Sequence, residues 1–285
     1  MWLATIVLIV LVLAVCVAGA LVYGALRWQG TTKDFRAKLE AARLPIAPTT
    51  YDPREIEGLP PPVRRYFRTV LQDGQPIVVG VRLSQEGQFR QSDAEDSWRS
   101  FKATQVFTTR PPGFDWDARI RTAPAVHVFV HDAYAAGAGI LHAALLGLVT
   151  VADLRGTPEA AQGELLRYLA ERAWFPTALL PSQGVRWEAI DDSTARATLT
   201  DGATSVSLEF RFDQEGLITS AWAPLRYRAV NGALQPAPWQ GRFSAYAHRG
   251  GMRIPLEAEV EWQLPDGPLP YWRGRITEIA YELAR

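Results

Sequence analysis

Residues 113–131, GFDWDARIRTAPAVHVFVH, hold two runs in which apolar and polar side chains alternate. From 114 to 120 every even position is apolar, and from 126 to 130 every even position is valine. A period of two residues places alternate side chains on opposite faces of a β-strand, so each run has one apolar face to bury. This stretch therefore predicts antiparallel, half-buried strands.

The same alternation extends in both directions along the chain. Further strands are expected at 77–85, 102–108, 186–190, 195–199, 205–212, 217–221, 225–230, 239–247, 256–262 and 275–281. Turn signals such as Asp201-Gly202 and Glu215-Gly216 separate them at intervals that are typical of a long antiparallel meander. A sheet of roughly ten or more strands has to curl or close on itself.

One helix is expected to interrupt the strands, near residues 157–176. Thr157 is a candidate N-cap, Pro158 suits the first turn, and Pro176 ends the helical pattern. The preceding stretch 133–152 has no Asp, Glu, Lys or Arg, so its length alone would allow a second membrane span. Its glycines favour a buried pair of strands instead. The helix is the natural cover for the apolar inner face of the curved sheet.

The amino-terminal segment differs from everything after it. Residues 2–26 contain no charged side chain, and at about 1.5 Å per residue they can cross a hydrocarbon core of ~30 Å. We therefore expect a transmembrane helix, with Tyr23 and Trp28 in the headgroup region. A cleaved signal peptide is the alternative, because Ala18-Gly19-Ala20 fits a cleavage site. The residues before Cys16 do not fit a lipoprotein signal.

Residues 27–75 connect the apolar segment to the strands. They combine a juxtamembrane helix that begins at Thr32, a proline-rich linker over 45–62 and a short helix at 61–71. The expected fold class is α+β. A long curved antiparallel β-meander, an incomplete barrel with a central helical insertion, occupies residues 76–285 and follows a transmembrane helix at 2–26.

Composition excludes several classes of protein. The 285-residue chain has 30 basic and 30 acidic residues, so it lacks the excess positive charge of a nucleic-acid binder. A single cysteine excludes an intrachain disulfide and any multi-cysteine metal site. The sequence has no phosphate-binding loop and no dinucleotide motif, and we expect no cofactor.

Three stretches resemble a bacterial family of membrane-associated proteins with a domain of unknown function. They are PPVRRYFRTVL at 61–71, GFDWDARI at 113–120 and GELLRYLAERAWFPTALLPS at 163–182. This resemblance implies no known activity and assigns no catalytic residue. The order of strands, helix and meander is also similar to that of the periplasmic lipoprotein carriers, which implies an incomplete barrel with a helical plug and an apolar cavity.

Two indications of cellular location disagree. Arg27, Lys33 and Arg36 follow the apolar segment, and the positive-inside rule then places the body of the protein in the cytoplasm. The resemblance to periplasmic carriers implies the other side. We expect a single-pass protein of the inner membrane, leave the side of its soluble domain open, and favour the extracytoplasmic side slightly.

Polar side chains that share a strand face are the candidates for chemistry. Asp115 and Asp117 form one such pair, and His131 lies on another strand. Carboxylates and histidine can serve as acid–base groups, but alternation with apolar residues places the two aspartates on a solvent face. His127 and His131, four apart on a strand, lie roughly 13 Å apart, so no metal site is expected. No catalytic residue is assigned.

Aromatic residues throughout the predicted strands and helix suit the lining of an apolar cavity. The expected ligand-binding residues are Trp116, Tyr134, Tyr168, Trp174, Phe175 and Trp187. On the helix, Glu164, Arg167 and Glu171 have ion-pair spacing. They are expected on a solvated helix face, with a polar rim at the cavity mouth as the alternative.

These observations favour a non-enzymatic domain, anchored in the bilayer by residues 2–26, that binds a lipid or another apolar ligand in a β half-barrel. One alternative is a scaffold that binds an unidentified envelope protein through an exposed sheet edge. The other is a hydrolase-type enzyme on an envelope substrate, with Asp115, Asp117, His131 or Glu188 as acid–base groups.

Overall fold

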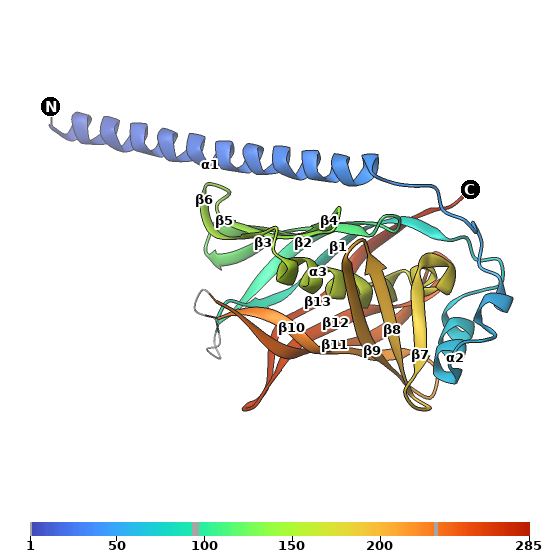
Figure 1. Cartoon of the computed structure of the whole chain (residues 1–285). Coiled ribbons are helices and arrows are strands. Elements are labelled where there is room, and N and C mark those ends of the chain that lie inside the picture. The colour runs from blue at the N-terminus through green and yellow to red at the C-terminus, as the bar shows by residue number, and fades with distance from the viewer. Residues whose placement is uncertain (1, 93–96, 231–232) are drawn as a thin grey trace.

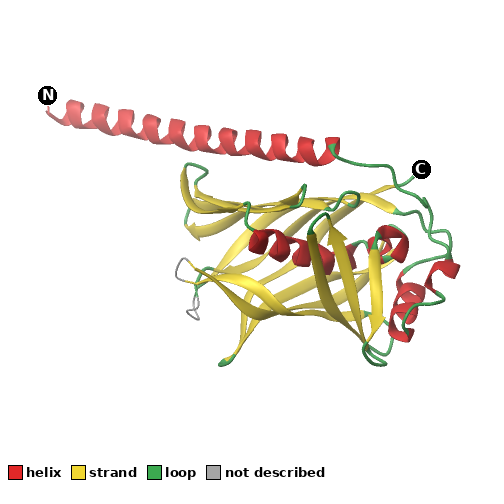
Figure 2. Cartoon of the chain, viewed as in Figure 1, coloured by secondary structure: helices red, strands yellow, loops and turns green. Residues whose placement is uncertain are grey.

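A computed structural model of the chain describes residues 2–92, 97–230 and 233–285. Within these residues it contains thirteen strands in one antiparallel sheet, three α-helices and four short 3-10 helices (Figures 1 and 2). The sheet is curved and open, with β6 and β7 as its two edges. The α+β class and the incomplete barrel expected from the sequence are therefore confirmed.

Strands that follow each other along the chain are paired, except β6 (Val149–Arg155) and β7 (Val185–Ala189), which form the two edges, and in the middle of the sheet β1 (Val78–Arg90) pairs with β13 (Gly267–Leu283). The expected strands at 217–221 and 225–230 are one continuous strand, β10. The bounds are β1 Val78–Arg90, β2 Trp98–Thr108, β3 Gly113–Ala123, β4 Val126–Ala135, β5 Ala138–Leu145, β6 Val149–Arg155, β7 Val185–Ala189, β8 Thr194–Asp201, β9 Thr204–Phe212, β10 Ile218–Val230, β11 Ala233–Arg249, β12 Met252–Leu264 and β13 Gly267–Leu283.

The pairing of β1 with β13 joins two halves of the meander into one sheet. At Gly87, which lies opposite Gly274, the two backbones approach so closely that a Cβ on Gly87 would stand 2.1 Å from the Arg273 carbonyl oxygen. No side chain fits in that space, so glycine is required for this close approach.

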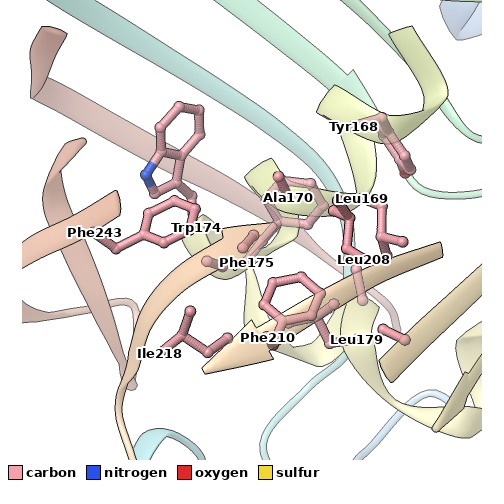
Figure 3. Close-up of a cluster of buried hydrophobic side chains, with 14 of the residues drawn as sticks. Tyr168, Leu169, Ala170, Trp174, Phe175, Leu179, Leu208, Phe210, Ile218 and Phe243 are labelled. Atoms are coloured by element: carbon pink, nitrogen blue, oxygen red, sulfur yellow. The ribbon is translucent and has the colours of Figure 1, made fainter. Parts of the chain in front are cut away.

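Helix α3 (Pro158–Glu171) connects the two edges of the sheet and crosses its concave side, with β4 and β5 on one flank and β9 and β10 on the other (Figure 1). As expected, Thr157 caps it by accepting a hydrogen bond of 3.1 Å from the Ala160 backbone N–H. Buried side chains of α3 and of the 3-10 turns after it pack between the strands (Figure 3). The helix therefore covers part of the apolar inner face.

Helix α1 runs without a break from Trp2 to Ala41. The expectation of a separate helix capped by Thr32 is wrong, because Thr32 lies inside α1 and its hydroxyl donates to the Trp28 carbonyl oxygen at 3.1 Å. Residues 2–23 are exposed, and from Gly24 onward one face of α1 lies on the outer face of the sheet (Figure 1). Among the described residues, α1 is the one helix long and apolar enough to cross a membrane.

Helix α2 (Pro61–Val70) forms where the sequence predicts a short helix, and it buries Val63, Tyr66 and Phe67. The Thr69 hydroxyl donates to the Glu215 carbonyl oxygen (2.9 Å) in the turn between β9 and β10. This helix therefore packs at the end of the sheet where β1 and β10 begin.

The close approach of β1 and β13 gives a stability test. We expect Gly87→Ala to lower the free energy of unfolding by about 1–3 kcal/mol, because the added methyl group forces two paired backbones apart. Gly80→Ala in the same strand is the control, since its Cβ meets a flexible Glu282 carboxylate oxygen at 3.3 Å. Chemical unfolding in detergent, followed by tryptophan fluorescence, measures both. Equal stability of the two variants would contradict the requirement for glycine at position 87.

Candidate functional site

A cavity of about 670 Å³ lies on the concave side of the sheet, beside α3. This volume falls within the roughly 300–1,000 Å³ range of small-molecule sites in proteins. Most of the wall is apolar, and it draws on both halves of the meander: Val128, Leu141, Leu154, Trp239, Phe243 and Val260 are examples. The space exists because α3 packs against the strands near the two edges and leaves the middle of the curved sheet uncovered.

Strand alternation explains which side chains line the cavity. On β3, Trp116 and Ile120 point inward, and on β4 the inward face carries Val128, Val130 and Asp132. The sequence places these residues at even positions on their strands, so the period of two puts them all on one face. The outward face of the same strands lies under α1.

A cluster of charged side chains faces the cavity from α3 and the adjoining strands. Arg167 forms ion pairs with Asp132 and with Glu171, the latter at 2.8 Å. Arg226 on β10 lies 3.3 Å from a Glu164 carboxylate oxygen. All five side chains line the cavity and are mostly buried, so desolvation has to be offset by these pairings.

Glu164 is the member of this cluster with unused bonding capacity. Burial, reinforced by the negative charge of Asp132, raises the pKa of its carboxyl group to about 8, against the lowering effect of Arg226. Its Oε2 atom is buried without a hydrogen-bond partner, and so is the Trp174 indole N–H. Both residues line the cavity through other atoms, so these two polar atoms lie within its wall, behind the accessible surface.

Aromatic rings complete one wall of the cavity. The Arg226 guanidinium lies 5.3 Å from the ring centroid of Trp239, and its Nη1 atom lies 3.2 Å from the Tyr271 hydroxyl. The Trp239 indole N–H also donates to that hydroxyl, at 2.9 Å. This arrangement holds a buried guanidinium in place by cation–π and hydrogen-bond contacts.

The structure separates the six aromatic residues expected to bind a ligand. Trp116 and Trp174 line the cavity. The other four lie in the packed core outside it: Tyr134, Tyr168, Phe175 and Trp187. Figure 3 shows Tyr168 and Phe175 among close-packed neighbours.

The expectation that α3 presents a solvated charged face is wrong. Glu164, Arg167 and Glu171 face the cavity because α3 crosses the inside of the sheet. Arg167 and Glu171 pair with each other, as their spacing predicts, and the partners Asp132 and Arg226 come from strands. Arg226 was not singled out from the sequence. Nothing in its own strand marks it, although Gly163 leaves room for it: a Cβ at Gly163 would meet only the Arg226 side chain, at 3.6 Å.

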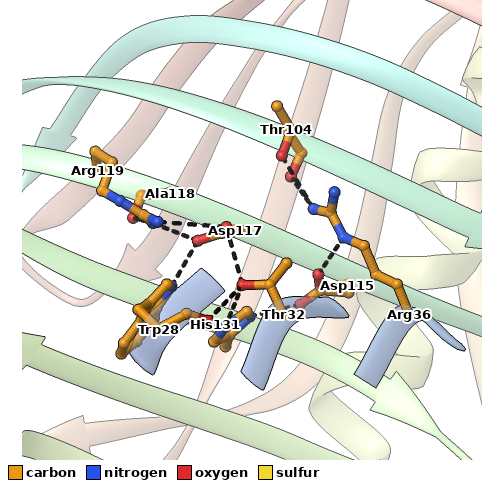
Figure 4. Close-up of polar contacts among 9 residues, drawn as sticks. All are labelled: Trp28, Thr32, Arg36, Thr104, Asp115, Asp117, Ala118, Arg119 and His131. Atoms are coloured by element: carbon orange, nitrogen blue, oxygen red, sulfur yellow. Dashed lines mark hydrogen bonds and ion pairs between the residues drawn. The ribbon is translucent and has the colours of Figure 1, made fainter. Parts of the chain in front are cut away.

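The acid–base candidates Asp115, Asp117 and His131 lie on the opposite face of the sheet, under α1 (Figure 4). Trp28 donates its indole N–H to Asp117 at 2.9 Å, and the Arg36 Nε–H donates to Asp115 at 2.7 Å. The predicted solvent face is therefore a buried interface, and Trp28 is buried there rather than exposed to lipid headgroups. We call the α1 clamp the contacts of Trp28, Thr32 and Arg36 on α1 with Asp115, Asp117 and His131 on the sheet.

The α1 clamp contains the elements of a hydroxyl–imidazole–carboxylate triad. Thr32 Oγ1 lies 3.1 Å from His131 Nε2, and the His131 Nδ1–H donates to Asp115 at 2.7 Å. All three residues are buried, and none of them lines the concave cavity. The Trp28 ring also stacks on His131 at 4.6 Å. In this packing the triad lies beneath α1, where the contact of Thr32 with His131 joins the helix to the sheet.

In the described part of the chain, no group of three or more His, Cys, Asp or Glu side chains is placed to hold a metal ion. His131 is instead engaged in the α1 clamp, and His142 lies 3.7 Å from an Asp153 carboxylate oxygen.

The raised pKa of Glu164 predicts a pH-dependent stability. Between its usual value of 4.5 and about 8, the folded chain holds a proton that the unfolded chain has lost, so stability falls as the pH rises through this window. We expect the melting temperature of Glu164→Gln to fall less from pH 5 to pH 8 than that of the wild type. Burial also raises the pKa of Glu171, so part of the slope remains.

Thermal unfolding by intrinsic fluorescence at several pH values measures this slope. Glu159→Gln, in the first turn of the same helix, leaves the charged cluster intact and serves as the control. An identical slope in the wild type and in Glu164→Gln would contradict the assignment of a buried proton to Glu164.

Two neighbouring threonines test the α1 clamp. Thr32→Val removes a buried hydroxyl that contacts Asp117 and His131, and we expect it to lower the free energy of unfolding by about 1–3 kcal/mol. Thr31 is exposed, and its hydroxyl makes the same bond to the carbonyl four residues back. Thr31→Val should therefore change stability by less than about 0.5 kcal/mol. Equilibrium unfolding in detergent compares the two, and equal effects would refute the clamp.

Comparison with known proteins places the chain in a family. The profile of the family of unknown function DUF6920 matches residues 57–281. No curated protein matches the chain. A solved structure that is similar to it is that of a LolA superfamily protein from Nitrosomonas europaea, at 13% identity and a TM-score of 0.39, covering 78% of this chain and 92% of that chain. The family match spans most of the sequence and confirms the resemblance seen in its motifs, and the chain belongs to the family of unknown function DUF6920.

Proposed function

We propose that this chain is a membrane-anchored binding domain, in which α1 crosses the bilayer and the half-barrel holds a lipid or another apolar ligand. The observation that carries this proposal is the concave cavity of about 670 Å³, with its mostly apolar wall. A wall of this kind with a few fixed polar groups is typical of a site for a mainly apolar ligand. The charged side chains that line the cavity from α3 and the adjoining strands suit the polar part of such a ligand.

The anchor is supported by the length and exposure of the first part of α1. The 22 residues from 2 to 23 are all exposed, and a helix of that length spans about 33 Å, close to the ~30 Å hydrocarbon core. Such an apolar surface is unfavourable in water, and a bilayer removes it from water. We place the protein in the inner membrane, with the extracytoplasmic side favoured for its β domain.

The two alternative functions have less support. An acid–base enzyme built on Asp115, Asp117 and His131 conflicts with the contacts that hold all three under α1, and Asp115 and His131 are buried there. Glu188 lies exposed on β7 beside Arg186. A scaffold that pairs through a sheet edge has β6 and β7 as its available edges. No feature of those strands specifies a protein partner, so the cavity remains the stronger basis for a function.

Photo-crosslinking in a bilayer tests the proposal. The full chain is reconstituted into phosphatidylethanolamine–phosphatidylglycerol vesicles that contain a trace of phosphatidylcholine with a diazirine in its acyl chain. After irradiation we expect crosslinks on cavity-lining peptides, such as the one that includes Trp239 and Phe243, as well as on α1. Crosslinks confined to α1 would refute binding in the cavity.

A pair of substitutions at Gly163 provides the matched control. Gly163→Leu extends a side chain into the cavity and should reduce the cavity crosslinks severalfold while leaving those on α1 unchanged. Gly163→Ala keeps the cavity nearly unchanged, and it should stabilise α3 by roughly 0.5–1 kcal/mol because alanine favours helix. Equal cavity labelling of the two variants would contradict the proposal.

A further inference from the structure

The junction between α1 and the sheet lies at one particular turn. Gly24 is the first residue of α1 that packs on the β domain, and a Cβ on it would stand 2.5 Å from the Leu146 carbonyl oxygen. From the other side of the contact, a Cβ on Gly147 would stand 2.7 Å from the Gly24 carbonyl oxygen. The backbone of α1 and the turn at residues 146–148, between β5 and β6, therefore touch directly.

This contact fixes the point along α1 at which the sheet begins, directly after the apolar segment. The exposed apolar helix ends at residue 23, and the contact with the 146–148 turn begins at residue 24. The exposed part is about as long as the ~30 Å core is thick, so no length of helix remains to hold the turn away from the bilayer. If α1 spans the membrane, the turn lies at its surface.

Side chains at this position suit a lipid surface. Val149 and Val151 on edge strand β6 are 61% and 56% exposed, more than any other large apolar side chain in the described part of the β domain. From 133 to 152 the chain carries no Asp, Glu, Lys or Arg, so neither the turn nor the start of β6 adds such a charge to this surface. An apolar, uncharged strand edge next to a membrane helix is best buried among lipid headgroups and the first acyl carbons.

The same strand forms part of the cavity wall. Val151, Ala152 and Leu154 of β6 line the cavity. Ser92, just after the end of β1, and Leu234, at the start of β11, line it too. Antiparallel pairing places the end of β1, the start of β6 and the start of β11 at one end of the sheet. In Figure 1 the N-terminal half of α1 extends beyond this end. One end of the cavity wall is therefore on the membrane side.

We propose that the 146–148 turn and the exposed edge of β6 rest on the bilayer surface and form a lip over which a membrane lipid passes directly into the cavity. This inference rests on the proposed function, and it specifies the source of the ligand as the bilayer that holds α1. A lipid that takes this route leaves the membrane beside Val149 and Val151 and meets the apolar wall without crossing water.

Single-cysteine labelling with the environment-sensitive fluorophore NBD tests the lip in the full chain. The probe is placed at Val149→Cys in a Cys16→Ser background and reconstituted into phosphatidylethanolamine–phosphatidylglycerol vesicles. We expect blue-shifted emission and strong quenching by a phospholipid with a doxyl group near its headgroup. Gln214→Cys, exposed in the β9–β10 turn at the opposite end beside α2, is the control and should show neither effect.

The native cysteine separates failure of the lip from failure of the anchor. In the wild-type chain, the probe on Cys16 reports the apolar part of α1 and should be quenched by a doxyl group deep in the acyl chain. A quenched Cys16 probe together with a water-like probe at 149 would overturn the lip alone. A water-like probe at Cys16 would overturn the membrane anchor of the proposed function, and the lip with it.

A charge substitution tests lipid passage. Val149→Asp places a charge where the lip meets lipid, on a side chain outside the cavity wall whose exposure makes a folding defect unexpected. We expect the rate of cavity crosslinking by the diazirine lipid to fall roughly tenfold, a change that corresponds to about 1.4 kcal/mol. Gln214→Asp is the matched control. An unchanged rate of cavity crosslinking in Val149→Asp would overturn passage over the lip while preserving ligand binding.

Discussion

The apolar concave face of the sheet has to be removed from water, and α3 is the element that covers it. A helix of 14 residues is about 21 Å long, which is enough to bridge the two flanks of the curved sheet but not to fill the space between them. The cavity is what remains between this helix and the middle strands. The fold and the candidate site therefore have one origin, the mismatch between a long curved sheet and a single short cover.

Crossing the inside of the sheet also decides where the charges of α3 lie. A helix on the surface would turn Glu164, Arg167 and Glu171 toward water, but here they point into a mostly apolar space. Each then needs a partner: Arg167 pairs with Glu171 and Asp132, and Arg226 contacts Glu164, so strands on opposite flanks of the helix take part. These contacts fix α3 to both halves of the meander.

Strand β3 serves both faces of the sheet. Its inward side chains line the cavity, whereas Asp115 and Asp117 on its outward face hold α1 through Arg36 and Trp28. The apolar helix and the cavity are thus attached to opposite sides of one strand. Because α1 is continuous through the α1 clamp, the orientation of the cavity relative to the apolar segment is set by packed side chains and direct backbone contact, with no linker between them.

The local sequence pattern alone predicts the strands, the Thr157 cap and the apolar helix, because alternation, capping chemistry and hydropathy act over a few residues. It also places Trp116 on an apolar face.

The position of α1 on the outer face of the sheet does not follow from local sequence pattern, so Thr32 was expected to be a cap and Asp115 and Asp117 were expected to meet solvent. Arg226 and Glu164 lie 62 positions apart, and they meet only because the chain passes from β6 through α3 to β7 and back to β10. Which charges are buried together depends on such long-range packing, whereas the sequence by itself determines which elements form.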